Sequence, residues 1–317
     1  MDETFEAGAR LSAIDTKMTG RFRMTSAYLV HASEPALVET GPTTSADAVT
    51  AGLASLGMGP EDLAHIVVTH IHLDHAGGAG RVGARFPGAT VWVHERGARH
   101  LADPTRLVAS AAQVYGGEDR LLEMFGPMDP IAEGRIRSVN EGDRIPLGDR
   151  YLDVMYTPGH ASHHVSLVDS DSGALFTGDA LGIHFPDVRV LRPATPPPDI
   201  DVELAVDSIE RIRARAESAM MFSHFGPVRE VDELCVVAAD RIRKWAGIVR
   251  TAMDETDDLD RITEILAART SAEFDEAGAS EEARERHEVL SGTRINAAGL
   301  VRYWTKRAER EGSPSGA

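Results

Sequence analysis

The sequence has a single cysteine and no long apolar run. Its one thiol, Cys235, cannot form an internal disulfide, which fits a reducing compartment. No stretch approaches the roughly 18 apolar residues that a membrane span needs, and the N-terminus lacks a basic region followed by an apolar core. We therefore expect a cytoplasmic protein with no membrane partner. Cys235 stands in a Glu-Leu-Cys-Val-Val stretch typical of a helix interior, so we interpret it as a core residue.

Basic side chains are also scarce. The chain has 33 lysines and arginines against 50 aspartates and glutamates, which gives a formal net charge of −17. Such a surface repels nucleic acid over most of its area. The composition therefore counts against nucleic acid as a partner, although a local basic groove could still exist, and we expect a small-molecule substrate.

The length and the hydrophobic content allow a large core. With 317 residues, 42% of them hydrophobic, the chain can form one big domain, or one domain plus an appendage. Strand and helix patterns alternate through most of it. The expected strands are 24–31, 35–41, 65–69, 90–94, 136–139, 144–147, 151–156, 165–169, 174–177 and 220–222, and the expected helices before residue 230 are 43–56, 79–86, 107–114, 120–124 and 202–212. We expect the hairpin at 24–41 to open the sheet, and residues 95–135 could lie across the site as a lid.

The last part of the sequence has a different pattern. From residue 230 onward, apolar residues recur at helical spacing in two successive stripes. We predict a main domain over residues 1–229, a helical C-terminal extension over 230–310, and a disordered tail over 311–317. The extension could close a substrate pocket, form a homodimer interface, or both.

Residues 66–80 contain the strongest motif, Ile-Val-Val-Thr-His-Ile-His-Leu-Asp-His-Ala-Gly-Gly-Ala-Gly. A β-branched run delivers three histidines and an aspartate into a glycine-rich turn at the carboxyl end of a strand. Imidazole and carboxylate groups suit zinc, iron or manganese. We interpret His70, His72, Asp74 and His75 as metal ligands rather than as part of a histidine-rich surface loop.

The second half of the chain repeats this placement. His160, Asp179 and His224 each follow closely on a predicted strand. So many histidines are too many neutral donors for a magnesium site, and no cysteine is available for a sulfur-bound one. Zinc, iron and manganese remain. A single iron held by two histidines and one carboxylate, suited to oxygen chemistry, would use part of the same set and stays open as an alternative.

Together these motifs resemble the metallo-β-lactamase superfamily. The match consists of Thr-His-Ile-His-Leu-Asp-His, Pro-Gly-His, Gly-Asp and Ser-His, in the family's order, and it spans most of residues 24–229. The resemblance implies an α/β fold, a four-layer αββα sandwich with a metal site at one edge between the sheets, here with a C-terminal helical appendage. The local sequence of these motifs looks closest to that of uncharacterised prokaryotic hydrolases near glyoxalase II. Such a likeness supports the fold assignment more than it identifies the substrate.

The resemblance also implies ligands for two metal ions. His70, His72 and His160 would hold one ion, Asp74, His75 and His224 the other, and Asp179 would bridge them. Two divalent ions, most simply zinc, with iron or manganese as alternatives, are the expected cofactors. Such a pair can share a hydroxide of lowered pKa, which the catalytic Asp74 would orient and from which it would accept a proton.

Other residues follow from their place near these motifs. His164 is expected to have a supporting or structural role. Glu39 occupies the position of a frequent aspartate in the family's Asp-Thr-Gly signature, which puts a longer carboxylate near the site. His184 is either a catalytic proton donor to the leaving group or an exposed loop histidine. Arg189 and Arg192 either hold an anionic substrate tail or are solvated.

The resulting hypothesis is a dinuclear metal-dependent hydrolase that uses a metal-bound hydroxide to open an ester, thioester or lactone. The alternatives are a mononuclear iron persulfide dioxygenase, a small-molecule phosphodiesterase, and a binding module that has kept the metal site.

Overall fold

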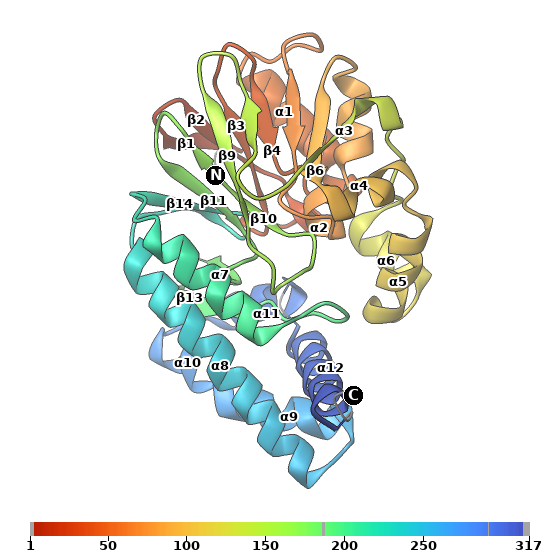
Figure 1. Ribbon diagram of the computed structural model, residues 1–317, viewed down its shortest axis with the longest axis vertical. Helices are drawn as coiled ribbons and strands as arrows, with labels where there is room; N and C mark the ends of the chain where they lie inside the picture. The colour runs from red at the N-terminus through yellow and green to blue at the C-terminus, as the bar shows by residue number, and fades with distance from the viewer. Residues whose placement is uncertain (1–2, 186–187, 291, 313–317) are drawn as a thin grey trace, which may run out of the picture. The chain divides into compact units, whose positions relative to one another are not determined.

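The computed structural model describes residues 3–185, 188–290 and 292–312 (Figure 1). The chain divides into two compact units. The first has the bounds Met1–Thr157, His163–Asp179 and Ala216–Val231, and the second has the bounds Pro158–Ser162, Ala180–Arg215 and Asp232–Ala317. The boundary expected at 229/230 lies next to the last passage into the second unit, but two earlier segments also belong to that unit.

Seven strands form the first sheet, in the order β1-β2-β3-β4-β5-β6-β7. Their bounds are β1 Thr4–Gly8, β2 Leu11–Asp15, β3 Ser26–Val30, β4 Ala36–Val38, β5 His65–Val67, β6 Thr90–His94 and β7 Ile136–Val139. The strands from β4 to β7 pair in parallel. The carboxyl ends of β4 and β5 therefore lie at the same edge, where parallel sheets place their binding sites.

Six strands form the second sheet, in the order β15-β14-β11-β10-β9-β8. Their bounds are β8 Arg144–Pro146, β9 Tyr151–Tyr156, β10 Val165–Asp169, β11 Ala174–Gly178, β14 Ala219–Phe222 and β15 Gly226–Val228. In this sheet β11 and β14 run parallel to each other. Their carboxyl ends therefore also share an edge.

The core of the first unit lies between the two sheets. Tyr28 and Val38 from the first sheet are buried with Leu152, Leu167 and Phe176 from the second. The rings of Tyr28 and Phe176 meet edge to face with their centroids 5.5 Å apart. This interdigitation is typical of a β-sandwich.

Helices complete the first unit. Their bounds are α1 Ala46–Ser55, α2 Leu73–Ala76, α3 Ala79–Arg85, α4 Glu95–Ala102, α5 Thr105–Tyr115 and α6 Glu118–Phe125, with short 3₁₀ turns at Met18–Gly20, Thr43–Ser45 and Glu133–Arg135. The helix α1 packs closely on β2, because a Cβ atom at Gly52 would lie 2.5 Å from the side chain of Ile14.

The second unit is mainly helical. Its elements are β12 Ile183–Phe185, β13 Val190–Arg192, α7 Val202–Ala214, α8 Val231–Glu255, α9 Leu259–Thr270, α10 Ala272–Glu276, α11 Glu281–Leu290 and α12 Thr293–Gly312. Trp245 of α8, Leu266 of α9 and Leu300 of α12 form its core together with Ile200 and Ala205. Among the described residues, no helix combines the length and apolar character that a membrane crossing requires.

The structure contains every strand expected from the sequence. It differs from the prediction in the strands that open the first sheet, in three short strands and in the C-terminal tail. The hairpin at 24–41 does not open the sheet, because β1 and β2 precede it. These two strands are rich in alanine, glycine and acidic residues, which favour strands weakly. The segments β12, β13 and β15 have three residues each, too few for a periodic pattern. The predicted tail at 311–317 begins within α12, and residues 313–317 lie outside the described part.

Candidate metal centre

The strands β5, β11 and β14 end at one edge of the first unit and carry most of the predicted ligands there. These are His70, His72, Asp74, His75, Asp179 and His224. The two sheets are joined at this edge, because the backbone N–H of Val165 donates to the carbonyl oxygen of Thr69 and that of Ser26 to the carbonyl oxygen of Ser223, both at 2.8 Å. Six of the seven predicted metal ligands are thus brought into one region.

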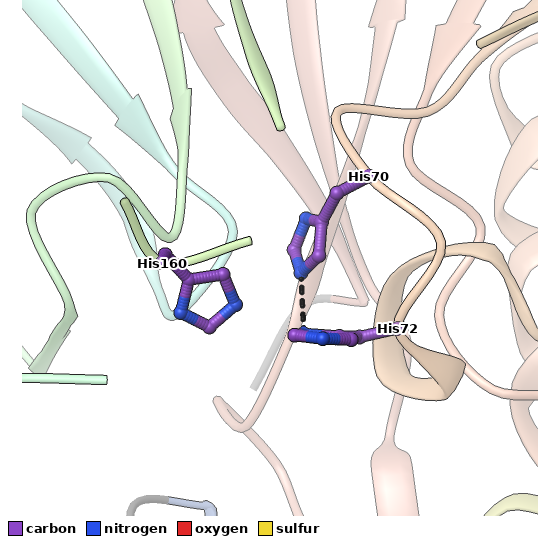
Figure 2. Close-up of side chains that lie close together, drawn as sticks. All are labelled: His70, His72 and His160. Atoms are coloured by element: carbon purple, nitrogen blue, oxygen red, sulfur yellow. Dashed lines mark hydrogen bonds between the residues drawn. The ribbon is translucent and has the colours of Figure 1, made fainter. Parts of the chain in front are cut away.

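His70 and His72 lie next to each other (Figure 2). Nε2 of His70 is 3.0 Å from Nδ1 of His72. The figure also draws His160, which belongs to the second unit, so its role as the third ligand stays a prediction. Within its own unit, His160 is buried and its Nδ1 lies 2.9 Å from the carbonyl oxygen of Ala194. Such a contact favours the proton on Nδ1 and leaves Nε2 as the donor for a metal.

Asp74, His75, Asp179 and His224 form a second group. The Nε2 atoms of His75 and His224 lie 3.2 Å apart, and Oδ1 of Asp179 is 3.3 Å from each. Oδ2 of Asp74 is 3.6 Å from Nε2 of His75 and 3.4 Å from Nε2 of His224. The two groups are continuous, because ligand atoms of His70, His75 and Asp179 also lie within 4.8 Å of one another.

Contacts behind two of the rings determine which nitrogen faces the group. The carbonyl oxygen of Met24 lies 3.1 Å from Nδ1 of His224, and Oε2 of Glu39 lies 3.5 Å from Nδ1 of His75. Both acceptors favour the proton on Nδ1, so each Nε2 presents its lone pair to its neighbour. Two lone pairs that face each other beside two carboxylates need positive charge between them.

The pKa shifts of these residues also indicate that the group requires positive charge. Burial lowers the pKa of His75, but Asp179, Asp74 and Glu39 outweigh it and raise the pKa well above its usual value. Burial also opposes protonation of His224, yet Asp179 and Asp74 raise its pKa to about 9. Burial raises the pKa of Asp74, but His75 and His224 lower it to about 2. A divalent cation would meet this demand with the rings neutral.

The donor set fits a centre for divalent metal ions. Four imidazoles and two carboxylates are ligand types that zinc, iron and manganese accept. His75 and His224 are almost fully buried, whereas 15% of the Asp74 side chain is exposed. Solvent therefore reaches the centre at Asp74.

Glu39 connects several of these residues from behind. It is 2% exposed, and its Oε1 accepts hydrogen bonds from Oγ1 of Thr69 and, at 3.4 Å, from Oγ of Ser223. Because Thr69 donates its proton to Glu39, its oxygen can accept one from Nδ1 of His70, which lies 3.0 Å away. One carboxylate therefore sets the proton position on His70 through Thr69 and also places a negative charge 3.5 Å from Nδ1 of His75. The sequence placed Glu39 near the site, and the structure shows what it contacts.

His164 supports the backbone that carries Asp179. The N–H of Asp179 donates to Nε2 of His164 at 3.0 Å, and Nδ1 of His164 lies 2.8 Å from Oγ1 of Thr157. Gly178, which directly precedes Asp179, has a φ of 52°. A Cβ atom at this position would collide with the ring of His164 and lie 2.7 Å from Oγ1 of Thr69. This geometry agrees with the supporting role expected of His164.

The sequence does not single out two further side chains beside the centre. The ring of His163 stacks on that of His70 with centroids 6.1 Å apart, and its Nδ1 accepts from the N–H of Ile71 at 3.5 Å. Burial raises the pKa of the Tyr115 phenol, and the charges of Asp74 and Asp179 raise it further. Tyr115 therefore lies within electrostatic reach of the centre. Its position in the expected lid region is the one sequence signal that pointed there.

His184 and Arg192 belong to the second unit. His184 is not an exposed loop histidine, because it pairs with Leu191 in the β12–β13 ladder and is 5% exposed. Its role as a proton donor stays a prediction. Arg192 is buried as well, so the expectation of a solvated side chain is wrong for it.

Comparison with known proteins places these features in a family context. A sequence model of the metallo-beta-lactamase superfamily matches residues 20–224. The metallo-beta-lactamase fold-containing protein ST1585 of Sulfurisphaera tokodaii is 30% identical over 172 residues, which is 53% of this chain and 62% of that protein. A hydroxyacylglutathione hydrolase of Rhodopseudomonas palustris is 31% identical over 156 residues, 49% of this chain and 47% of that protein. An acyl-coenzyme A thioesterase, MBLAC2 of Bos taurus, is 31% identical over 121 residues, 36% of this chain and 40% of that protein. The matches thus span about half the length of these relatives.

Solved structures share the fold. The crystal structure of ST1585, from Sulfolobus tokodaii, aligns with a TM-score of 0.66 at 22% identity over 92% of this chain and 98% of that one. The metallo-beta-lactamase family protein TTHA1429 of Thermus thermophilus aligns with a TM-score of 0.62 at 18% identity, over 97% of this chain and 95% of that one. The expected α/β fold, with sheets flanked by helices and further C-terminal helices, is confirmed.

Proposed function

Because the chain belongs to the metallo-beta-lactamase superfamily, we propose that it is a metal-dependent hydrolase that opens an ester, thioester or lactone. The convergence of four imidazoles and two carboxylates at one edge of the first unit carries this proposal. Divalent metal ions, zinc in the first place, would lower the pKa of bound water toward neutrality and polarise the bond to be broken.

The ligand assignment follows the family pattern. His70, His72 and His160 would hold one ion, and Asp74, His75 and His224 the other, with Asp179 shared between them. The close approach of His75, His224, Asp74 and Asp179 supports the second of these sites. The first depends on His160, and its test is the metal content of a His160→Ala variant.

The residues of the chain would orient the reactants. Asp74 keeps part of its side chain open to solvent, so its carboxylate can accept a hydrogen bond from the attacking water and then take up its proton. Glu39 holds His70 and His75 in the orientation that a metal requires. His184 is the candidate donor of a proton to the leaving group.

Among acyl substrates we propose a thioester. The names of two relatives, hydroxyacylglutathione hydrolase and acyl-coenzyme A thioesterase, both denote hydrolysis of a thioester. Each match covers at most about half of this chain. The proposal therefore extends to the bond that is broken and not to the thiol that leaves.

The test is the release of free thiol by the zinc-loaded protein from a panel of acyl thioesters, with matched oxyesters and lactones alongside. We expect thioester turnover that a chelator removes and zinc restores. Asp74→Asn should lower kcat by about 10²–10⁴-fold, whereas Asp207→Asn, at an exposed position of α7 that is not among the candidate ligands, should leave it unchanged. One iron per chain together with oxygen uptake, and no thiol release, would instead favour the persulfide dioxygenase.

A further inference from the structure

A buried arginine in the second unit has no ionic partner among the described residues. Arg192, at the end of β13, is 3% exposed, and no ion pair among the described residues includes it. Its guanidinium lies between the rings of Trp245 and Phe274, 4.7 Å and 5.0 Å from their centroids, and Nη2 donates to Oγ1 of Thr293 at 3.0 Å. Nε has no hydrogen-bond partner in the described part of the chain. A buried charge without a counter-charge is destabilising unless something supplies one.

Two glutamates near Arg192 are engaged elsewhere. Glu273 is buried but already pairs with Lys244 at 3.0 Å and lies 3.9 Å from Arg241. Glu288 is exposed and accepts hydrogen bonds from the hydroxyl of Thr293 and, at 2.8 Å, from its N–H. Both carboxylates act on the guanidinium only at longer range, and burial still lowers the pKa of Arg192.

His287 does not provide Arg192 with a hydrogen-bond acceptor either. It is fully buried beside Phe185 and Phe274, and neither of its nitrogens has a hydrogen-bond partner within the described residues. The buried part of this region therefore offers a cationic side chain with unfilled hydrogen-bonding capacity.

A cavity of about 260 Å³ adjoins Arg192. Its walls include the ring of Phe274 and the hydroxyl of Thr293, and its outer part holds the exposed glutamates Glu281, Glu285 and Glu288 together with Arg284, which pairs with Asp275 outside the lining. This size is near the lower end of small-molecule sites, roughly 300 Å³. The cavity is thus positive where it is buried, apolar on one wall, and negative on balance where it opens, because three glutamates stand there against Arg284.

From this charge distribution we propose that the cavity binds a small zwitterion of the amino-acid type. The carboxylate would lie against Arg192 and complete its hydrogen bonding. The ammonium group would lie between Glu281 and Glu285, and the apolar part would pack on Phe274. This site is formed entirely by the second unit and does not depend on the proposed hydrolase activity.

The experiment is calorimetric titration of the full-length protein with three matched probes. L-phenylalanine carries both charges, 3-phenylpropionate carries only the carboxylate, and phenethylamine only the ammonium. We expect phenylalanine to bind most tightly, 3-phenylpropionate about threefold more weakly, and phenethylamine not at all. No binding of phenylalanine at millimolar concentration, or equal binding of phenylalanine and 3-phenylpropionate, would overturn the proposal.

Variants assign the two ends of the ligand. Arg192→Gln should weaken the binding of phenylalanine and 3-phenylpropionate by about tenfold or more. The double variant Glu281→Gln/Glu285→Gln changes only exposed positions, so it remains informative if the arginine variant does not fold. It should weaken phenylalanine about threefold and leave 3-phenylpropionate unchanged. Glu276→Gln, exposed on α10 and outside the cavity lining, is the control. Binding that is the same in all of these variants would also exclude the site.

Discussion

Glu39 acts on the metal centre through its neighbours. Its two carboxylate oxygens face Thr69 and Ser223 on one side and His75 on the other. Glu39→Gln keeps the shape but turns one acceptor into a donor, which conflicts with either Thr69 or the Nδ1 proton of His75. We expect metal affinity to fall about 10–100-fold, measured by competition with a chromophoric chelator.

A nearby carboxylate provides the control for this prediction. Glu34 lies 3.3 Å from His65 but is largely exposed and outside the centre. Glu34→Gln should leave metal affinity unchanged. If Glu39→Gln also bound metal as tightly as the unaltered protein, the proton positions on His70 and His75 would not depend on Glu39.

His287 should make the protein sensitive to acid. Burial, together with Arg192 and Arg286, lowers its pKa to about 2, whereas an unfolded histidine has a pKa of about 6.5. Above pH 6.5 the residue is neutral in both the folded and the unfolded state, so it does not reduce the free energy of unfolding. As the pH falls from there toward 2, the unfolded state binds a proton that the folded state does not. The free energy of unfolding should therefore fall by up to about 1.4 kcal/mol per pH unit from this residue alone.

His287→Phe isolates this contribution. The ring already lies among Phe185 and Phe274, and its nitrogens make no hydrogen bond within the described residues, so phenylalanine should be tolerated. Urea unfolding at pH 7 and pH 5 should show a smaller loss of stability in the variant. Equal losses in both proteins would mean that His287 is protonated in the folded state.

The sequence predicts single residues best where they share a motif. His70, His72, Asp74 and His75 lie within six positions, so their ligand types and spacing are legible without a fold. His163 and Tyr115 gain their meaning only from the packing of distant segments. Tyr115 stands in no motif, and His163, although it lies between His160 and His164, has nothing in its local sequence that separates it from an ordinary loop residue.

At the scale of elements, the turn from β11 into Asp179 is the most constrained. Gly178 has a positive φ, and a side chain there would collide with His164 and Thr69. Gly178→Ala should destabilise the protein by about 2–3 kcal/mol through backbone strain and the collision. It should also weaken metal binding, because Asp179 follows directly.

A second glycine-to-alanine substitution should stabilise the protein, in contrast to the one at Gly178. Gly247 is exposed in the middle of α8, and a Cβ atom added there would meet no atom within 4 Å apart from its chain neighbours and the nearby backbone of its own helix. Gly247→Ala should stabilise the protein by about 0.5–1 kcal/mol. Chemical unfolding of both variants measures the contrast, and similar values for the two would show that the turn at Gly178 adjusts.

Elements are predictable when their own residues establish them. The strand β6 is flanked by a turn and consists mainly of threonine, valine and tryptophan, so its range follows from the sequence alone. The helix α4 is different. Its start is capped by the side chain of His94, which accepts from the N–H of Arg96, and histidine is not among the usual capping residues.

At the scale of the whole molecule, the core of the second unit is assembled from distant parts of the sequence. Ile200 and Ala205 pack with Trp245, Leu266 and Leu300. Deleting residues 232–317 would leave the first two without their neighbours. We expect the truncated protein to bind a hydrophobic dye and to lose cooperative unfolding of this region. A truncated protein that binds no dye and has an intact α7 would show that the C-terminal helices are a separable addition.

The same interleaving constrains how the protein is made. The chain leaves the first unit at Pro158 and returns to it twice, so β14 and β15 reach the second sheet only after the segment Ala180–Arg215 has been synthesised. Until then β11 lacks its partner β14 and presents an open sheet edge. Synthesis on the ribosome therefore passes through a stage in which most of the metal ligands exist but the sheet that holds them is incomplete. Stalling or premature termination before residue 219 should yield aggregating fragments rather than a smaller working protein.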